Sequence, residues 1–96
     1  MLKVTQIRIL EAYKLLCFFN TNEQKVLDLR QALDSDNEMV QTILQPHIFK
    51  TAKVGELGEI LWENTGKIRE LDGSVTLCAY DISPEFAYHY SVNKEA

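Results

Sequence analysis

The sequence is poor in the residues that identify several whole classes of protein. Its 96 residues include only two cysteines, two histidines, two prolines and four glycines. Cys17 and Cys78 belong to no CxxC or CxxH element, so we expect two small apolar side chains in a reducing compartment rather than a disulfide or redox pair. Neither His47 nor His89 has another His or Cys three to five residues away, which is the usual spacing of zinc ligands. The sequence therefore predicts neither a metal site nor a cofactor.

Long apolar segments and an excess of basic residues are missing as well. Polar side chains interrupt residues 1–10, so this segment lacks the apolar core of a secretory signal peptide. No stretch reaches the ~20 apolar residues of a membrane-spanning helix, and we expect a cytoplasmic protein that does not enter a membrane. Fourteen Asp and Glu outweigh ten Lys and Arg, for a net charge of −4. This balance argues against nucleic acid as a partner, because phosphate binding requires a basic surface.

The N-terminal third has the apolar alternation of β-strands. The pattern predicts strands over residues 3–10 and 12–19, joined by a tight hairpin near residues 10–11, and a third strand over residues 25–29. The second of these strands is apolar on both faces, which is typical of a central strand covered on both sides. The polar residues 20–23 that follow it favour a turn.

Helix and turn signals alternate in the remainder of the chain. Ser35 and Glu38 have the spacing of a capping box and predict a short helix, which Pro46 ends before a second turn through residue 52. Ser83 and Pro84 mark the start of a last helix. Strands are predicted at residues 53–54 and 59–63, with a break at 64–66 and a hairpin with arms 67–71 and 74–80 around a two-residue type I′ turn at Asp72-Gly73.

These elements define an α+β fold. We expect a small, mostly antiparallel sheet, built from the two N-terminal strands and the later hairpins, with two or three short helices. A length of 96 residues suits a single core. Residues 1–91 would form one domain, and residues 92–96 a frayed C-terminal tail.

Three segments of the chain resemble a known family. The resemblance is carried by Tyr13-Lys14-Leu15-Leu16-Cys17-Phe18-Phe19 with Val26-Leu27-Asp28-Leu29, by Pro46-His47-Ile48-Phe49-Lys50 with Gly58-Glu59-Ile60-Leu61-Trp62, and by Asp81-Ile82-Ser83-Pro84-Glu85-Phe86-Ala87-Tyr88. Together they span most of residues 2–91 and are similar to the small bacterial domain-of-unknown-function family numbered 2442 (DUF2442). In that family the Trp is usually followed by Pro-Asn-Gly and runs almost directly into the last helix. Here Glu63 replaces the proline, and residues 66–80 are an insertion.

The resemblance implies a compact α+β domain with no demonstrated enzymatic activity. Genes of this family often lie beside that of a second small protein, in a pairing reminiscent of toxin–antitoxin modules. Some relatives are fused to a helix-turn-helix domain, and by analogy this chain would be the binding partner rather than the DNA reader.

The leading functional hypothesis is a small, non-enzymatic protein-interaction module, an antitoxin-like partner of a neighbouring small protein that carries basic charge. Trp62, Tyr88 and Tyr90 are the candidate contacts, because Trp and Tyr frequently anchor interfaces, with core packing as the alternative role for these aromatic side chains. Glu63 and Glu85 would be rim charges that face the basic partner.

Two further hypotheses stay open. The strand over residues 12–19 is apolar on both faces, while few helices are predicted to cover it, so a second copy could cover one face in a homodimer. Alternatively, the seven acidic residues from Glu56 to Glu85 could serve a metal-dependent hydrolase or another enzyme, which predicts a concave pocket with at least two convergent carboxylates. A solvated acidic face that keeps the protein soluble explains the same residues without catalysis.

Overall fold

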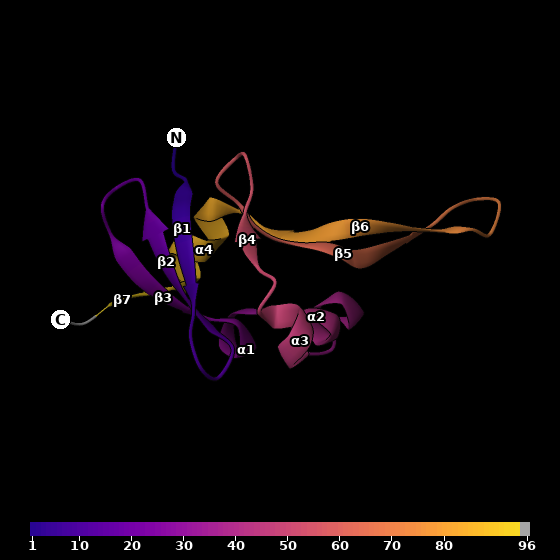
Figure 1. The fold of residues 1–96 in the computed structure, drawn as a ribbon, viewed down its shortest axis with the longest axis horizontal. Coiled ribbons are helices and arrows are strands. Elements are labelled where there is room, and N and C mark those ends of the chain that lie inside the picture. Colours follow the sequence, from indigo (N-terminus) through magenta and orange to yellow (C-terminus); the bar gives the residue numbers. More distant parts are fainter. Residues whose placement is uncertain (95–96) are drawn as a thin grey trace.

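The central position of strand β2 (Lys14–Phe19) organises the first of two antiparallel sheets (Figure 1). In the computed structural model, which describes residues 1–94, β2 lies between β1 (Val4–Ile9) and β3 (Gln24–Asp28). The short β7 (Val92–Asn93) pairs with the outer edge of β3. All neighbouring strands in this sheet run antiparallel, as the hairpin signals predict.

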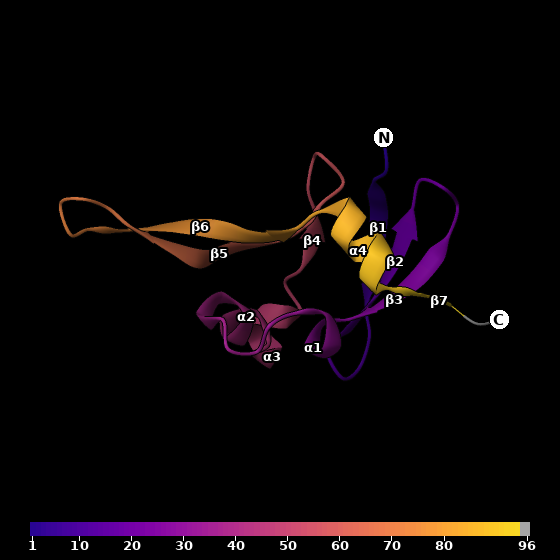
Figure 2. The ribbon, with the colours of Figure 1, turned by 180° about the vertical axis from the view of Figure 1, so that it is seen from behind.

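Both faces of β2 are buried, which confirms the prediction of a covered central strand. Leu15 and Cys17 are fully buried on one face, and Leu16 on the other face is 4% exposed. Helix α4 (Pro84–Tyr90) crosses the sheet (Figure 2), and its Ala87 belongs to the same core cluster as Leu15. The chain therefore supplies the cover of this core face itself.

The second sheet has the order β4-β5-β6, with β4 (Lys53–Val54), β5 (Ile60–Arg69) and β6 (Val75–Ile82). It joins the first sheet where Val4 N donates to Gly58 O (3.0 Å) in the turn before β5. The two sheets share one core, and the α+β class with antiparallel strands and short helices is confirmed.

Strand β5 continues through residues 64–66, so the predicted break there is wrong. These residues form a bulge, and the pairing of β5 with β6 shifts between Trp62 and Gly66. Asn64 adopts φ 58°, and Thr65 Oγ1 donates to Trp62 O (2.7 Å). The local hydrogen bond replaces part of the ladder and lets one long strand bend without ending.

The loop between β5 and β6 has three residues, so the predicted two-residue type I′ turn at Asp72-Gly73 is wrong. Glu70 N donates to Ser74 O (2.8 Å), and Gly73 N donates to Glu70 O (3.0 Å). Gly73 has φ 90°, whereas a type I′ turn requires positive φ at both central residues. Asn22 takes the equivalent left-handed position, with φ 69°, in the loop between β2 and β3.

Residues 1–94 contain four short helices: α1 (Leu29–Ala32), α2 (Glu38–Ile43), α3 (Pro46–Phe49) and α4. The capping residue of α2 is Asn37, whose Oδ1 accepts from Met39 N (2.9 Å), so the predicted cap at Ser35 is wrong. An Asn side chain satisfies the same orphan amides that a Ser hydroxyl would. The cap predicted at Ser83 is confirmed, because Ser83 Oγ accepts from Phe86 N (3.1 Å).

The C-terminal segment is ordered by pairing with β3, which corrects the expected frayed tail at residues 92–96. Val92 lies opposite Val26, and Lys94 N donates to Gln24 O (2.9 Å). The backbone groups at the edge of β3 thereby gain partners. Residues 95–96 of that expected tail lie outside the described residues.

Trp62 lies at the centre of the shared core. It is fully buried, its ring lies 6.1 Å from that of Tyr80, and its Nε1 donates to Phe49 O at the end of α3 (3.1 Å). A buried indole N–H without a partner would be costly, so this bond fixes where α3 sits under β5.

We predict that Trp62→Ala lowers the free energy of unfolding by about 3–5 kcal/mol, because it removes the largest fully buried side chain. Trp62→Phe should cost less but still destabilise, since Phe49 O loses its donor. Urea unfolding followed by far-UV circular dichroism measures both. Leu71→Ala, at a fully exposed position, is the control and should unfold like wild type. Equal unfolding midpoints for Trp62→Ala and wild type would contradict this assignment.

Candidate functional site

A two-stranded projection extends from the body of the molecule, beyond the bulge in β5. Figure 1 and Figure 2 both show the β5–β6 hairpin reaching away from the helices, and the molecule measures 52 × 28 × 19 Å. We call residues 66–78 the arm. An isolated two-stranded ribbon is at best marginally stable in water, so a structure of this kind normally requires cover.

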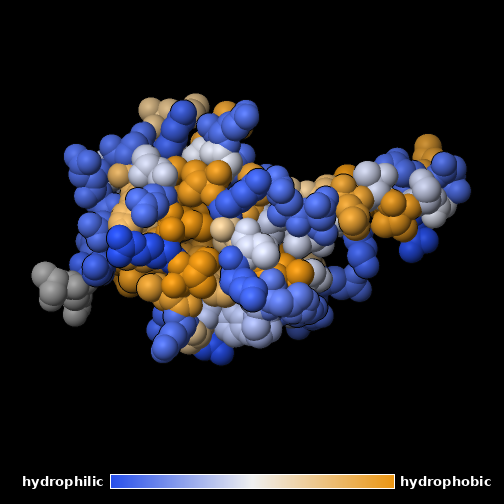
Figure 3. Space-filling view, viewed as in Figure 1, coloured by the Kyte–Doolittle hydropathy of each residue, from blue (hydrophilic) through white to orange (hydrophobic). Residues whose placement is uncertain are grey.

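The arm carries apolar side chains in contact with solvent. Ile68, Val75 and Leu77 are each about half exposed, and Leu71 at the tip is fully exposed. Figure 3 shows hydrophobic side chains along the arm, separated from the hydrophobic surface of the body. Exposed apolar side chains gathered on one projecting element are typical of an interaction surface.

The strand pairing divides the arm into two faces. Lys67 lies opposite Leu77 and Arg69 lies opposite Val75, so these four side chains share one face. The opposite face carries Ile68, which pairs with Thr76. The first face is therefore both basic and apolar.

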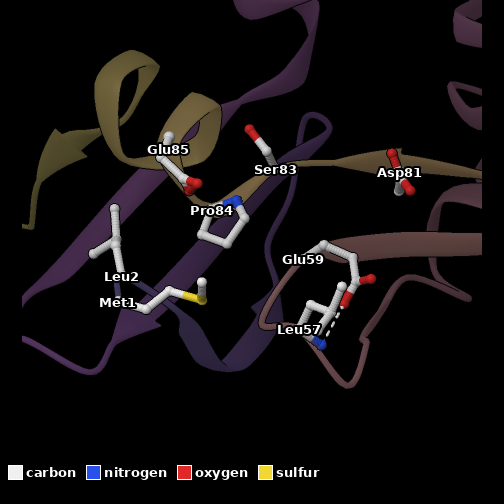
Figure 4. Close-up of a pocket in the computed structure, with 8 residues that line it drawn as sticks. All are labelled: Met1, Leu2, Leu57, Glu59, Asp81, Ser83, Pro84 and Glu85. Carbon is white, nitrogen blue, oxygen red and sulfur yellow. Dashed lines mark hydrogen bonds between the residues drawn. The ribbon is translucent and has the colours of Figure 1, made fainter.

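A cavity of about 290 Å³ opens at the root of the arm (Figure 4). Glu59 comes from the turn before β5, Asp81 from β6, and Glu85 from the first turn of α4. Glu59 Oε1 accepts from Leu57 N (3.1 Å), and Figure 4 shows the carboxylates of Glu59, Asp81 and Glu85 apart from one another. The complete lining is Met1, Leu2, Leu57, Glu59, Asp81, Ser83, Pro84 and Glu85.

The acidic side chains of this region form no metal centre in the part of the chain that the structure describes. Within residues 1–94, no group of three or more His, Cys, Asp or Glu could hold a metal ion. The cavity does have the acidic lining that the hydrolase hypothesis requires, but its carboxylates do not converge on one point.

None of the helices described within residues 1–94 is long and apolar enough to cross a membrane.

The five predicted contact residues do not form one surface. Trp62 is fully buried, so its assignment as a partner contact is wrong: the apolar core binds the ring more strongly than an interface rim would. Glu63 is exposed and makes an ion pair with Lys53 (2.7 Å), which occupies its carboxylate on the neighbouring strand. Glu85 lines the cavity at the root of the arm, with its carboxylate exposed.

Tyr88 makes contacts within the chain and holds α4 against the first sheet. Its hydroxyl donates to both carboxylate oxygens of Glu23 (2.8 and 3.0 Å), and its ring packs edge-on against Phe19. Lys25 Nζ lies 3.7 Å from the ring centroid and donates to Tyr88 O (2.6 Å). This cluster fastens α4 to β3. Tyr90 is half exposed, stacks on Phe86 and lines a different concavity beside β7.

The same cluster sets the protonation of its members. The hydrogen bond from Tyr88, assisted by Thr21 and by the charge of Lys25, holds the pKa of Glu23 below its ordinary value of 4.5. In return, the bond to the Glu23 carboxylate and partial burial raise the pKa of Tyr88 above 10.0. Elsewhere, burial raises the pKa of the Cys17 thiol to about 12, which leaves it protonated and unreactive at neutral pH.

The arm itself was not among the predicted contact sites. Its residues alternate in the pattern of an ordinary hairpin, and period-two alternation does not tell which face a sheet buries. The usable signal was the run Val75-Thr76-Leu77-Cys78-Ala79-Tyr80, in which both alternating sets include apolar side chains. No third strand pairs with the arm, because β4 pairs only with Ile60 and Leu61.

Comparisons with family models, with curated proteins and with solved structures find no match to the chain. The resemblance to family 2442 rests on the three quoted segments and stays a prediction.

We predict that Tyr88→Phe destabilises the protein in a pH-dependent way. A lowered pKa of Glu23 contributes stability above its ordinary value of 4.5, and this contribution is lost as the pH falls through the lower folded value. The difference between wild type and Tyr88→Phe should therefore be largest near neutral pH and shrink in acid. It should also shrink above pH 10.0, as Tyr88 ionises.

Thermal unfolding across this pH range measures the effect. Tyr90→Phe removes a hydroxyl from the same helix at a half-exposed position and is the matched control, with no pH-dependent change expected. A Tyr88→Phe difference that stays constant from acid to neutral pH would overturn the role of the Glu23 bond.

Proposed function

We propose that this chain is a small, non-enzymatic protein-interaction module that binds through its arm. The observation that carries the proposal is the exposure of Ile68, Leu71, Val75 and Leu77 on a ribbon that lies outside the core. Full burial of an exposed side chain of this kind stabilises by about 1.5–3 kcal/mol. Leu71 could contribute that amount on binding, and the three half-exposed side chains about half of it each. A binding partner that covers the arm gains this free energy.

The acidic side chains at the root of the arm favour a partner with basic and apolar groups. Asp81 and Glu85 line the cavity at the root, beside the apolar side chains of Leu2 and Pro84. An apolar depression with an acidic rim accepts a side chain or loop that carries cations next to apolar groups. The family resemblance adds the expectation of an antitoxin-like role beside a neighbouring small protein, and the metal-dependent hydrolase remains the alternative.

The test measures binding of the neighbouring gene's purified product by isothermal titration calorimetry. We expect a Val75→Ser/Leu77→Ser variant to bind at least tenfold more weakly than wild type, because both substitutions remove apolar surface from one face of the arm. The far-UV circular dichroism spectrum should be unchanged, since neither side chain belongs to the core cluster.

Ile9→Ser/Val92→Ser is the matched control, because it makes the same chemical change at two exposed positions of the other sheet. This control should bind like wild type. Equal affinities for the arm variant and wild type would contradict the proposed binding surface.

A further inference from the structure

The outer edge of β6 is an unprotected pairing edge. β6 is the last strand of its sheet, so one side of its backbone has no strand beside it in the described chain. Residues 75–80 contain neither charge nor proline, the two features that normally protect an edge strand. An edge of this kind is a template for another strand.

The hydrogen-bond alternation identifies which groups of β6 point outward. Glu70 N donates to Ser74 O and closes the loop, so the next pair, Arg69 with Val75, is not hydrogen-bonded. Alternation along the ladder then directs the backbone N–H and C=O of Val75, Leu77 and the following odd-numbered residues away from β5. Only registers that pair odd-numbered residues with one another satisfy these groups.

We infer that the occupant of this edge is a second copy of this chain, with the two β6 strands antiparallel about a twofold axis at Cys78. This inference rests on the proposed function and names the partner of the arm. Leu77 then pairs with Ala79 of the second copy, and Val75 with Asp81 of the second copy. Both are pairs of odd-numbered residues, as the ladder requires. The two three-stranded sheets become one continuous six-stranded sheet.

Charge complementarity favours a second copy in this register. Arg69 lies directly opposite Val75 on β5, so Asp81 of the second copy lies in the same row and on the same face. Two strand spacings, ~9.6 Å, separate their backbones, a distance that an Arg side chain can bridge. Within residues 1–94 neither Arg69 nor Asp81 makes an ion pair. The twofold axis produces the Arg69–Asp81 contact twice.

The register also carries each arm tip to the root of the other arm. Gly73 of the second copy lies opposite Ser83, which lines the acidic cavity together with Leu57 and Pro84. The loop at the tip also carries Leu71, two residues before Gly73, whose side chain is fully exposed in one chain. The register thus brings the tip loop of the second copy beside this cavity.

Cys78 provides a built-in probe of this arrangement. At the twofold axis it faces Cys78 of the second copy in a non-hydrogen-bonded pair, where Cα atoms of antiparallel strands lie ~4.5 Å apart, within disulfide range. Cys17 is fully buried and does not compete. A mild oxidant such as diamide takes up the two electrons and two protons that disulfide formation releases.

The first experiment is light scattering of the full chain under reducing conditions. We expect twice the 11.1 kDa mass of one chain for wild type. Ala79→Pro removes the backbone N–H that would donate across the dimer to the second β6 strand. Ala79→Lys places a cation in the same row, and on the same face, as Lys67 of the second copy, which lies opposite Leu77. Both should raise the dissociation constant at least tenfold. Ile9→Lys, on the exposed edge strand β1, is the matched control and should remain dimeric.

The second experiment is diamide cross-linking. Wild type and Cys17→Ala should give a disulfide-linked dimer and Cys78→Ser none. Thr76→Cys in the Cys78→Ser background should also give none, because Thr76 faces Tyr80 of the second copy. A reduced wild type that stays at 11.1 kDa would overturn the inference, and efficient Thr76→Cys cross-linking would overturn the register. A monomer that binds the neighbouring gene product through the arm would leave the proposed function standing.

Discussion

The burial of Trp62 is the constraint on which the rest of the structure depends. Its indole N–H reaches Phe49 O and ties the helical layer to β5, while its ring fills the core beside Tyr80. Its own carbonyl accepts from Thr65 and so holds the bulge. Trp62 therefore lies at the end of the core. After the bulge that follows it, Gly66 is still buried near Met39 of α2, and the strand then extends away from the helices. The position of the arm follows from this packing.

The body and the arm meet different physical demands. In the body, the outer edge of β3 gains cover from the chain: β7 pairs with β3, and Tyr88 and Lys25 fasten α4 across that edge. The arm lacks this cover because β4 extends beside only the first two residues of β5. The outer edge of β6 and the apolar side chains of the arm therefore stay exposed to solvent and are accessible to another molecule. The acidic cavity at its root and the cations on its face are complementary groups within a single sequence.

The strands, the fold class and the start of α4 could be predicted from the sequence because they depend on local signals. Alternation identifies β2, and Ser83 followed by Pro84 identifies a helix start. The bulge at Asn64 could not be told from a break, since Asn-Thr-Gly favours both, and the choice depends on β6 continuing beside it. The contact role expected of Trp62 failed for a related reason. An aromatic residue type suits both a core and an interface, and only tertiary packing separates them.

The pairing of β7 with β3 has a kinetic consequence. Residues 24–26 meet residues 92–94, so this contact closes a loop that contains every element from α1 to α4, whereas the β1–β2–β3 meander joins only neighbouring segments. Contacts between distant segments carry the larger loop-closure entropy and slow folding. The meander can therefore form before the C-terminal segment arrives. The outer edge of β3 stays open until the last turn of α4 and β7 reach it, which makes this closure a late step of folding.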